Sequence, residues 1–224
     1  MPRGINTSVA PTMEAVNARQ EYWISTEKCK AGKGYLRFRR IADILMSSLL
    51  ILLLFLPMLI LGILVFFTSK GPAFYRQERL GLNGKPFMLV KFRSMRHDAE
   101  KDGPSWAKDD DERCTKFGKF LRKTRLDELP QLWNILVGDM SFVGPRPERP
   151  VFYEEFETYI HGFKNRLAVT PGLTGWAQVN GGYDLLPEEK IVYDMEYIRQ
   201  CSFRMDLKCL LMTFRVVITQ KGAR

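Results

Sequence analysis

The sequence predicts a mainly α-helical, membrane-associated protein with a small β-hairpin. Residues 44–69 carry no charge and are almost all Leu, Ile, Met, Val or Phe, which exceeds the roughly 20 residues of a membrane-crossing helix. Several later segments repeat apolar residues at helical spacing. Asn83-Gly84, a dipeptide typical of tight hairpin turns, separates two short segments, 72–80 and 86–92. A nucleotide-binding α/β sheet is not favoured, because no glycine-rich phosphate loop follows a predicted strand.

The composition points to an anionic partner. The 224 residues include 34 Lys plus Arg against 25 Asp plus Glu, a formal net charge of +9. Nucleic acid, a lipid surface or a phosphorylated substrate would each satisfy this charge. The four cysteines form no CxxC pair and have no histidine at metal-ligand spacing, so neither a zinc site nor a disulfide framework is predicted. We expect reduced thiols.

The flanks of the apolar stretch bear on its topology. Residues 28–42 carry six basic residues and no acid, and residues 70–96 carry seven basic residues and one acid. Both flanks therefore favour the cytoplasm, which a re-entrant hairpin satisfies. Pro57 lies mid-stretch, where a helix bends, and a limb over 44–56 reaches about 20 Å of a hydrocarbon core of about 30 Å. The alternative is a spanning helix with a tolerated proline kink.

The remaining elements follow from local pattern and turn residues. The last predicted helix alternates apolar and basic residues, which fits either a helix in the membrane interface or a core helix. In chain order we expect an acid-rich surface loop over 97–113, helix over 115–137 with a break or restart at Pro130, a rigid extended segment over 144–147, an amphipathic helix over 151–166, a turn-rich loop over 170–182, and helices over 187–200 and 203–219.

Two adjacent carboxylates, Asp127 and Glu128, are the candidate chemical centre. Pro130 favours a helix start just after them, and the positive helix end together with Arg122 and Arg125 would keep a carboxylate ionised. An ionised aspartate can attack phosphorus, and a neighbouring glutamate can hold Mg²⁺ on the phosphate oxygens. The alternative is structural, since Thr124-x-x-Asp127 resembles a helix capping box.

Other cations stand where a phosphate site would use them. Lys91 and Arg93 end the second hairpin strand, and Arg146 lies between two prolines that restrict its backbone. Arginine offers paired donors that suit a pyrophosphate. The glycines of 171–176 would let backbone N–H groups approach an anion. A solvated strand end, an extended connector and a plain turn are the respective alternatives.

Taken together, five segments carry a resemblance to a known family. They are Lys91-Phe-Arg-Ser-Met95, then Leu126-Asp-Glu-Leu-Pro-Gln131 with Asn134, then Gly138-Asp-Met-Ser141, then Gly144-Pro-Arg-Pro147, then Pro171-Gly-Leu-Thr-Gly175 with Gln178-Val-Asn180. In this order the set resembles bacterial sugar transferases, the monotopic polyprenyl-phosphate phosphoglycosyl transferases. The resemblance covers about residues 36–219, and the length is similar to that of the small members, which consist of the catalytic core.

The resemblance implies a reaction and roles for residues. The family transfers a sugar 1-phosphate from a nucleotide diphosphate sugar, here expected to be a UDP-sugar, to polyprenyl (undecaprenyl) phosphate with release of UMP. Asp127 would be the nucleophile that forms a phosphosugar-aspartate, and Glu128 the Mg²⁺ ligand. Contacts to the substrate are implied for Lys91, Arg93, Arg122, Arg146, Gln131, Asn134, Thr174 and Gln178.

The resemblance also implies an organisation of the chain. We expect a polar and basic N-terminal tail over 1–35, a re-entrant membrane helix broken at Pro57 over 36–69, and a cytoplasmic catalytic domain with interfacial helices over 70–224. The expected location is the cytoplasmic face of the bacterial inner membrane, where the enzyme would catalyse the first membrane step of a surface polysaccharide or glycoprotein glycan. The particular sugar and glycan pathway are not identified, and a homo-oligomer is left open.

Two departures and three alternatives stand beside this reading. Asp111-Glu112-Arg113 and Gly181-Gly182 replace the Asp-Pro-Arg and Gly-Arg that are frequent in the family, and the second affects contacts to sugar or nucleotide. A non-catalytic basic adaptor for anionic lipids or acidic proteins explains the charge and the apolar stretch but not the dyad. A spanning glycosyltransferase is a further alternative. Nucleic-acid binding is not expected, because no segment reads as a groove helix or a stacking sheet.

Overall fold

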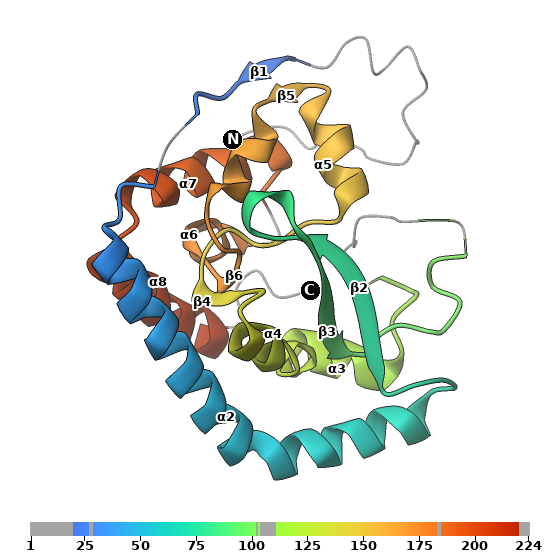
Figure 1. Cartoon of the computed structure of the whole chain (residues 1–224). Coiled ribbons are helices and arrows are strands. Elements are labelled where there is room, and N and C mark those ends of the chain that lie inside the picture. The colour runs from blue at the N-terminus through green and yellow to red at the C-terminus, as the bar shows by residue number, and fades with distance from the viewer. Residues whose placement is uncertain (1–19, 27–28, 102, 104–110, 183–184, 220–224) are drawn as a thin grey trace.

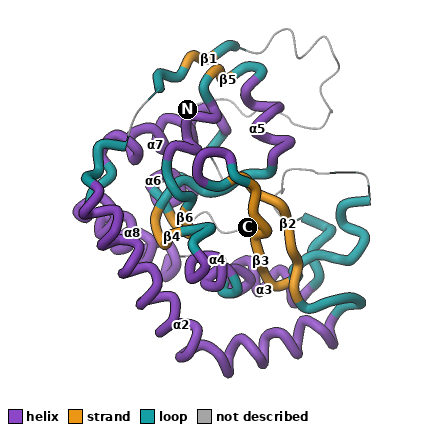
Figure 2. The backbone as a smooth tube through the Cα atoms, in the orientation of Figure 1, coloured by secondary structure: helices purple, strands orange, loops and turns teal. Residues whose placement is uncertain are grey.

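The computed structural model describes residues 20–26, 29–101, 103, 111–182 and 185–219. It is mainly helical with short strands, as predicted, and the long helix α2 curves around one side of the remaining elements (Figure 1). Figure 2 shows the same path by type of structure. The helices and strands are β1 (Tyr22–Trp23), α2 (Lys33–Thr68), β2 (Phe74–Leu80), β3 (Pro86–Phe92), α3 (Lys116–Thr124), α4 (Gln131–Val137), β4 (Ser141–Val143), α5 (Pro150–Glu157), β5 (Ile160–His161), β6 (Gly172–Thr174), α6 (Trp176–Asn180), α7 (Pro187–Gln200) and α8 (Phe203–Thr219).

The predicted hairpin is confirmed, with a longer connection than the Asn-Gly pair suggested. Strands β2 and β3 are antiparallel, with Phe74 opposite Phe92 and Leu80 opposite Pro86. Residues 81–85 connect them, and Asn83 and Gly84 adopt φ values of 56° and 77°. Asn and Gly tolerate this left-handed region best, which explains why they occupy the turn. The described residues also form two short parallel pairs, β1 with β5 and β4 with β6.

The predicted helices over 187–200 and 203–219 are confirmed as α7 and α8. The predicted helix over 115–137 is divided twice: α3 ends where Arg125 turns left-handed (φ 57°), and α4 begins after Pro130, with a 3₁₀ turn over Leu126–Glu128 between them.

Two other expectations were wrong. The helix expected over 151–166 forms only as far as Glu157, because residues 160–161 pair with β1 as β5; Gly162 (φ 98°) then leads into a 3₁₀ turn over Phe163–Ala168. The loop expected over 170–182 contains β6 and α6. Parts of the predicted tail (1–19, 27–28) and acid-rich loop (102, 104–110) lie outside the described residues.

Helix α2 remains helical through Pro57 and bends in its middle part (Figure 1). The expected break is therefore a bend and not an interruption. Among the described residues α2 is the one helix long and apolar enough to cross a membrane, by length and composition. That it enters and leaves the same face of a bilayer stays a prediction.

Both halves of α2 are attached to the same body of the molecule. Near its start, Arg40 donates to the Ile135 and Leu136 carbonyls at 2.6 Å each, and Asp43 accepts from the Phe142 backbone N–H at 3.2 Å. At its end, Arg93 donates to the Ser69 carbonyl at 2.6 Å. Val65 packs there with Phe92 and Leu121 in one buried cluster. The apolar arc between these attachments leaves most of its side chains exposed.

Two further clusters of buried apolar side chains hold the body together. The larger one joins α5, α7 and the Phe163–Ala168 turn through residues such as Tyr153, Phe163 and Ile191. The other packs Phe87 and Leu89 of the hairpin against α4. Each buried side chain of this size stabilises the fold by roughly 1.5–3 kcal/mol. The hairpin is thereby fixed beside the 3₁₀ turn that carries the two acids.

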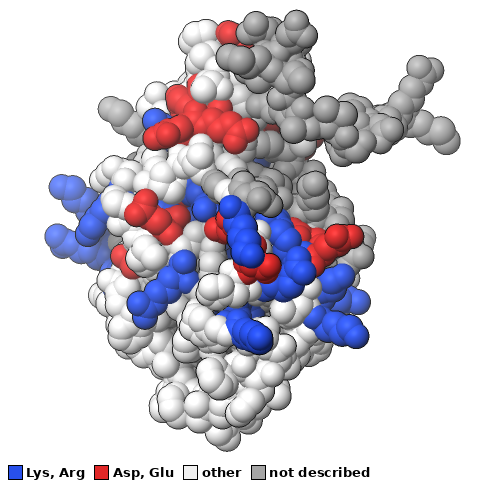
Figure 3. Space-filling model, turned by 90° about the vertical axis from the view of Figure 1, so that its right-hand side faces the viewer, with Lys and Arg blue, Asp and Glu red and all other residues white. Residues whose placement is uncertain are grey.

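Charge is unevenly distributed over the surface. In Figure 3 the lower end of the molecule, where Figure 1 places the bend of α2, is white, and Lys and Arg side chains lie in a band above it. Helix α8 adds exposed Leu211 and Phe214 to the apolar surface. An apolar surface bordered by basic residues is the distribution that suits a bilayer with anionic headgroups.

Candidate active site

The chain between α3 and α4 presents two neighbouring carboxylates. Left-handed Arg125 ends α3, and Leu126 and Leu129 pack against the cluster formed by Val65, Phe92 and Leu121. Asp127 and Glu128 lie between these two leucines and are buried, with 7% and 9% exposure. The leucines thus anchor the turn on the core and fix the backbone that carries both acids.

The capping-box alternative for this segment is wrong. The Thr124 hydroxyl donates back to the Phe120 carbonyl at 2.8 Å, within α3, instead of capping a following helix. Pro130 is the residue that precedes the first turn of α4. The two acids therefore have no capping function that accounts for them.

Glu128 is tightly paired. Arg146 reaches both carboxylate oxygens of Glu128 through its two terminal nitrogens. Burial alone would raise the pKa of Glu128, but Arg146, Arg125 and Lys91 outweigh it and lower that pKa below its ordinary value. Glu128 is therefore a fixed negative charge.

The adjacent residue, Asp127, differs from Glu128 in its pKa and in its hydrogen bonding. Burial, followed by repulsion from Glu128, raises the pKa of Asp127 to about 6, against the attraction of Lys91, Arg122 and Arg146. We find no hydrogen bond to its carboxylate from any described residue. At neutral pH it is mainly ionised with its oxygens uncommitted, which is the state that a nucleophile requires.

Lys91 is the cation that the hairpin contributes. It pairs in register with Tyr75, and its Nζ lies 5.3 Å from the centre of that ring. Burial lowers the pKa of Lys91 to about 8, although Asp127 opposes the shift. Lys91 is therefore mainly positively charged at neutral pH, and it attracts the Asp127 carboxylate electrostatically.

A cationic cavity of about 670 Å³ opens beside the dyad. Lys91, Arg122, Arg125 and Arg146 all line it. Within the described part of the chain its lining includes eleven Lys or Arg residues and two glutamates. Such a cavity favours a multiply charged anion.

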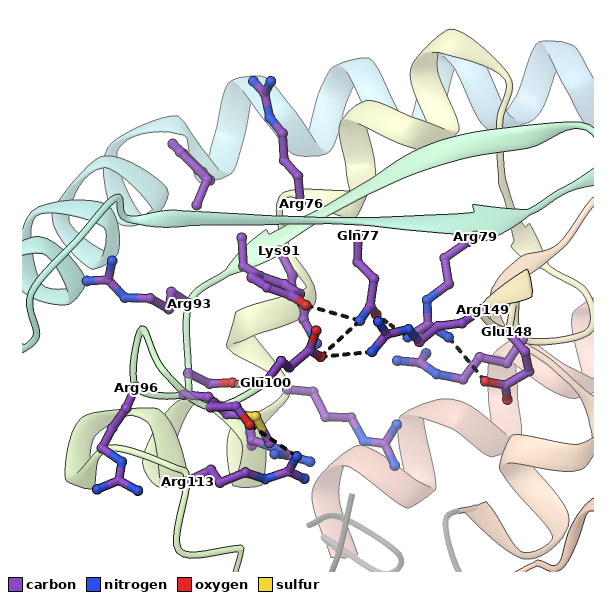
Figure 4. Close-up of a pocket in the computed structure, with 18 of the residues that line it drawn as sticks. Arg76, Gln77, Arg79, Lys91, Arg93, Arg96, Glu100, Arg113, Glu148 and Arg149 are labelled. Carbon is purple, nitrogen blue, oxygen red and sulfur yellow. Dashed lines mark hydrogen bonds and ion pairs between the residues drawn. The ribbon is translucent and has the colours of Figure 1, made fainter. Parts of the chain in front are cut away.

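Sequence reasoning missed one wall of this cavity. Tyr75, Gln77 and Arg79 alternate along β2 and line the cavity. In Figure 4, Gln77 and Arg79 extend from one side of the strand, whereas Arg76, which also borders the cavity, extends from the other side toward α2. Gln77 donates to the Tyr75 hydroxyl at 3.1 Å and accepts from Arg79 at 2.5 Å. The available signal was the unbroken polar run over residues 76–79 of a predicted strand, which does not distinguish its two faces.

The predicted phosphate contacts fall into two groups. Arg122 and Arg146 face the dyad, and Arg122 also approaches the Cys114 sulfur at 3.1 Å. Arg93 also lines the cavity, but its guanidinium donates hydrogen bonds to the Ser69 carbonyl and hydroxyl and to the Pro72 carbonyl. In this arrangement Arg93 joins the hairpin to the end of α2, and its contact with a phosphate stays a prediction.

Two other predicted contacts serve the fold in the structure. The Asn134 side chain accepts from the Val90 N–H at 3.1 Å and donates to the Met88 carbonyl at 2.8 Å, which ties α4 to β3. The Thr174 hydroxyl lies 2.6 Å from that of Thr213 in α8. Their binding of substrate stays a prediction.

The side-chain amides of Gln131 and Gln178 differ from these. Both are buried, and neither amide has a hydrogen-bond partner among the described residues. Gln178 lines the cavity, whereas Gln131 is fully buried on the first turn of α4. Buried amides are normally satisfied, so these two call for a ligand or water.

The carboxylates of Asp127 and Glu128 are the candidate ligands for Mg²⁺. Among the described residues there is no cluster of three or more His, Cys, Asp or Glu side chains. Mg²⁺ usually binds one or two carboxylates, several waters and substrate phosphates instead of a cage of protein ligands. Asp127 and Glu128 supply the one or two carboxylates of that mode, and an ion bound to Glu128 would share the carboxylate with Arg146, which contacts both of its oxygens.

The chain matches a known protein family over most of its length. Residues 34–220 match the family described as bacterial sugar transferase. The UDP-glucose:undecaprenyl-phosphate glucose-1-phosphate transferase of Klebsiella pneumoniae is 45% identical over 181 residues, covering 79% of this chain and 39% of that protein. The protein of the same name from Caulobacter vibrioides is 40% identical over 193 residues, 83% of this chain and 71% of that protein.

The name of a third relative specifies a different sugar. The UDP-N-acetylgalactosamine-undecaprenyl-phosphate N-acetylgalactosaminephosphotransferase of Aeromonas hydrophila is 40% identical over 193 residues, covering 85% of this chain and 46% of that protein. The chain thus spans less than half the length of the Klebsiella and Aeromonas proteins. These relatives share a lipid phosphate acceptor and differ in the sugar.

Proposed function

Because this chain belongs to the bacterial sugar transferase family, we propose that it is a phosphoglycosyl transferase that moves a sugar 1-phosphate from a UDP-sugar to undecaprenyl phosphate. The observation that carries the proposal is the ionisable, uncommitted carboxylate of Asp127 beside a cationic cavity. The names of the relatives support the donor and acceptor classes.

In the first step a carboxylate oxygen of Asp127 attacks the β-phosphorus of the UDP-sugar. A bond forms between that oxygen and phosphorus, and the bond from phosphorus to the bridging oxygen breaks. UMP leaves with the electron pair, and the sugar phosphate is now bound to Asp127 as an acyl phosphate. Lys91, Arg122 and Arg146 lie close enough to Asp127 to neutralise the charge that develops.

In the second step a phosphate oxygen of undecaprenyl phosphate attacks the same phosphorus. The bond between phosphorus and Asp127 breaks, which regenerates the carboxylate and releases the lipid-linked sugar diphosphate. One nucleophile therefore serves two substrates in turn, the ping-pong order of covalent catalysis.

Glu128 has a separate role. Its lowered pKa keeps it anionic, and the ion pair with Arg146 fixes its orientation. We assign Mg²⁺ to Glu128, where the ion would supply charge neutralisation to the phosphate oxygens. Arg146, which pairs with Glu128 and lines the cavity, would share this carboxylate with the ion.

We place the enzyme on the cytoplasmic face of the bacterial inner membrane, with α2 re-entrant. Three observations support this placement: the two ends of α2 attach to one body, the bend of α2 carries no charge, and basic residues border it. A donor from water and an acceptor from the bilayer would then meet at one carboxylate. The reaction would begin a surface polysaccharide or glycoprotein glycan.

The test is a panel of UDP-sugars with undecaprenyl phosphate, monitored for UMP release and for a sugar phosphate adduct by intact mass. We expect one or few sugars to release UMP, an adduct on residue 127 when the acceptor is omitted, and loss of turnover with a chelator that excess Mg²⁺ restores. Binding to anionic vesicles without UMP release from any donor would sink the proposal and leave the adaptor reading.

A further inference from the structure

One acid in the cationic cavity is not used by the reaction. Of the two glutamates that line it within the described residues, Glu148 is the buried one, with 7% exposure. Arg79 donates to its Oε2 at 3.1 Å (Figure 4), and Lys190 donates to its Oε1 at 3.1 Å. Burial alone would raise the pKa of Glu148, but Lys190 and Arg79 lower it to about 2. A permanent negative charge is thus built into an anion-binding cavity.

The chemistry of a carboxylate limits what this wall can accept. A carboxylate accepts about four hydrogen bonds and donates none, and Arg79 and Lys190 supply one to each oxygen. The remaining lone pairs can accept a charge-assisted hydrogen bond from a hydroxyl, whereas an ionised phosphate oxygen has no proton to donate to them. The wall at Glu148 therefore suits the uncharged, hydroxyl-bearing parts of a ligand whose phosphates lie elsewhere in the cavity.

A second group on the same cavity points to the same chemistry. The Gln178 amide lines the cavity, and both its nitrogen and its oxygen are buried without a hydrogen-bond partner among the described residues. A Cβ on Gly175 would lie 2.7 Å from Gln178 Oε1, so glycine leaves the room that this amide occupies. An amide offers one acceptor and two donors, which a pair of hydroxyls can satisfy.

The chain fixes this wall relative to the dyad. Glu148 lies two residues after Arg146, whose guanidinium holds Glu128, and Pro147 between them restricts the backbone. The Arg146 carbonyl accepts at 3.0 Å from Arg166, which is itself fully buried and paired with Asp194 at 2.6 Å. The segment that carries the phosphate-facing arginine therefore also carries the carboxylate.

We propose that Glu148 and Gln178 form a subsite for vicinal hydroxyls of the nucleotide sugar donor, on either the ribose or the transferred sugar. This inference rests on the proposed function, because it assumes that the phosphates of the same ligand face the dyad. Glu148 is a specificity-determining residue of the donor site, and Arg79 and Lys190 hold it in place.

The test measures hydroxyl selectivity in binding, so it does not depend on turnover. One arm compares UMP with 2′-deoxy-UMP and 3′-deoxy-UMP. The other compares the UDP-sugar that binds most tightly with analogues that lack single ring hydroxyls. In the wild-type protein we expect removal of a contacted hydroxyl from one of the two rings to weaken binding about 10- to 100-fold. Equal affinity for parents and deoxy analogues in both arms would overturn the subsite.

The variants assign that selectivity to Glu148. Glu148→Gln should reduce the discrimination to about twofold or less, because a neutral amide replaces the charged acceptor. Glu100→Gln is the matched control, since it removes the same charge from the same cavity at the half-exposed glutamate that pairs with Arg149. It should leave the discrimination unchanged. Unchanged discrimination in Glu148→Gln overturns the assignment.

A further variant guards against misfolding. Glu148→Asp keeps the charge that Arg79 and Lys190 require and withdraws the carboxylate by one methylene, so it should fold and still lose discrimination. Retained discrimination in this variant counts against the subsite. UMP release without hydroxyl selectivity sinks only the subsite, whereas hydroxyl-selective binding without UMP release from any donor sinks only the transfer reaction.

Discussion

Asp127 and Asp206 are equally buried aspartates in two different regions, with 7% and 8% exposure. At the junction of α2 and α8 the Asp206 carboxylate accepts from the Tyr35 and Tyr197 hydroxyls, the latter at 2.7 Å, and Arg39 lies 3.5 Å away. Beside the cavity, Asp127 has nearby cations but no hydrogen bond from any described residue. A satisfied carboxylate stabilises a junction, whereas an unsatisfied one retains its capacity to react.

The two regions also differ in what their cations do. Arg39 also donates to the Ser141 hydroxyl and the Val143 carbonyl, so its contacts stabilise the fold. Arg122 and Arg146 are directed to a cavity that a substrate can enter. The contrast predicts that substitutions near Asp127 change chemistry and that substitutions near Asp206 change stability.

Asp127→Asn makes the sharpest test of this contrast. The amide cannot form the acyl phosphate, so we expect turnover to fall by a factor of about 10³ or more and the mass adduct to disappear. UMP release and intact mass measure both. Near-normal UMP release by this variant would show that another group is the nucleophile.

Arg146→Lys should have the next largest effect. Lysine is a point charge and cannot reach both oxygens of Glu128, so we expect kcat to fall about 10- to 100-fold while the fold persists. Arg149→Lys, at the Glu100 ion pair, is the matched control and should change kcat far less. Equal losses in both variants would indicate a general charge effect.

The pH dependence should follow the Asp127 carboxylate. Because the pKa of Asp127 is raised to about 6, the nucleophile is lost as pH falls through 6, and kcat/KM should drop about tenfold per unit below it. A raised carboxylate pKa also means that the folded protein loses stability as pH rises from about 4 to 6. Asp127→Asn should therefore raise the unfolding temperature at pH 7, and a lowered temperature would contradict the sign.

Asp206→Asn should affect turnover least. It leaves Arg39 without its buried counter-charge, so we expect the free energy of unfolding to fall by about 3 kcal/mol. The kcat of the molecules that remain folded should stay within about twofold of the wild type, measured below the unfolding temperature. A large loss of kcat in fully folded protein would erase the distinction between the two aspartates.

Features that depend on neighbouring residues could be predicted from the sequence. The apolar stretch, the Asn83-Gly84 turn, the last two helices and the Asp127-Glu128 pair each depend on neighbouring residues, and local pattern was sufficient to find them. Glu148 escaped prediction although it adjoins a recognised segment, because its role depends on Arg79 and Lys190 from distant elements.

Long-range packing also decided which groups the predicted arginines contact. Arg93 and Arg146 are both cavity-lining arginines, yet Arg93 is directed to carbonyls at the end of α2 and Arg146 to Glu128. The adjacent sequence does not specify which of these partners each arginine contacts. The shortened α5 has the same origin, since pairing of β5 with β1 competes with continuation of the helix beyond Glu157.

If α2 lies in a bilayer as proposed, the contact of Arg93 with the end of α2 would link the lipid environment to the dyad. Lys91, which acts on Asp127, precedes Arg93 by two residues in the same segment. A displacement of α2 by thinner or more tightly packed lipid would be transmitted through this arginine to the lysine. Acyl-chain length would then be a determinant of catalytic rate, independent of the concentration of the acceptor.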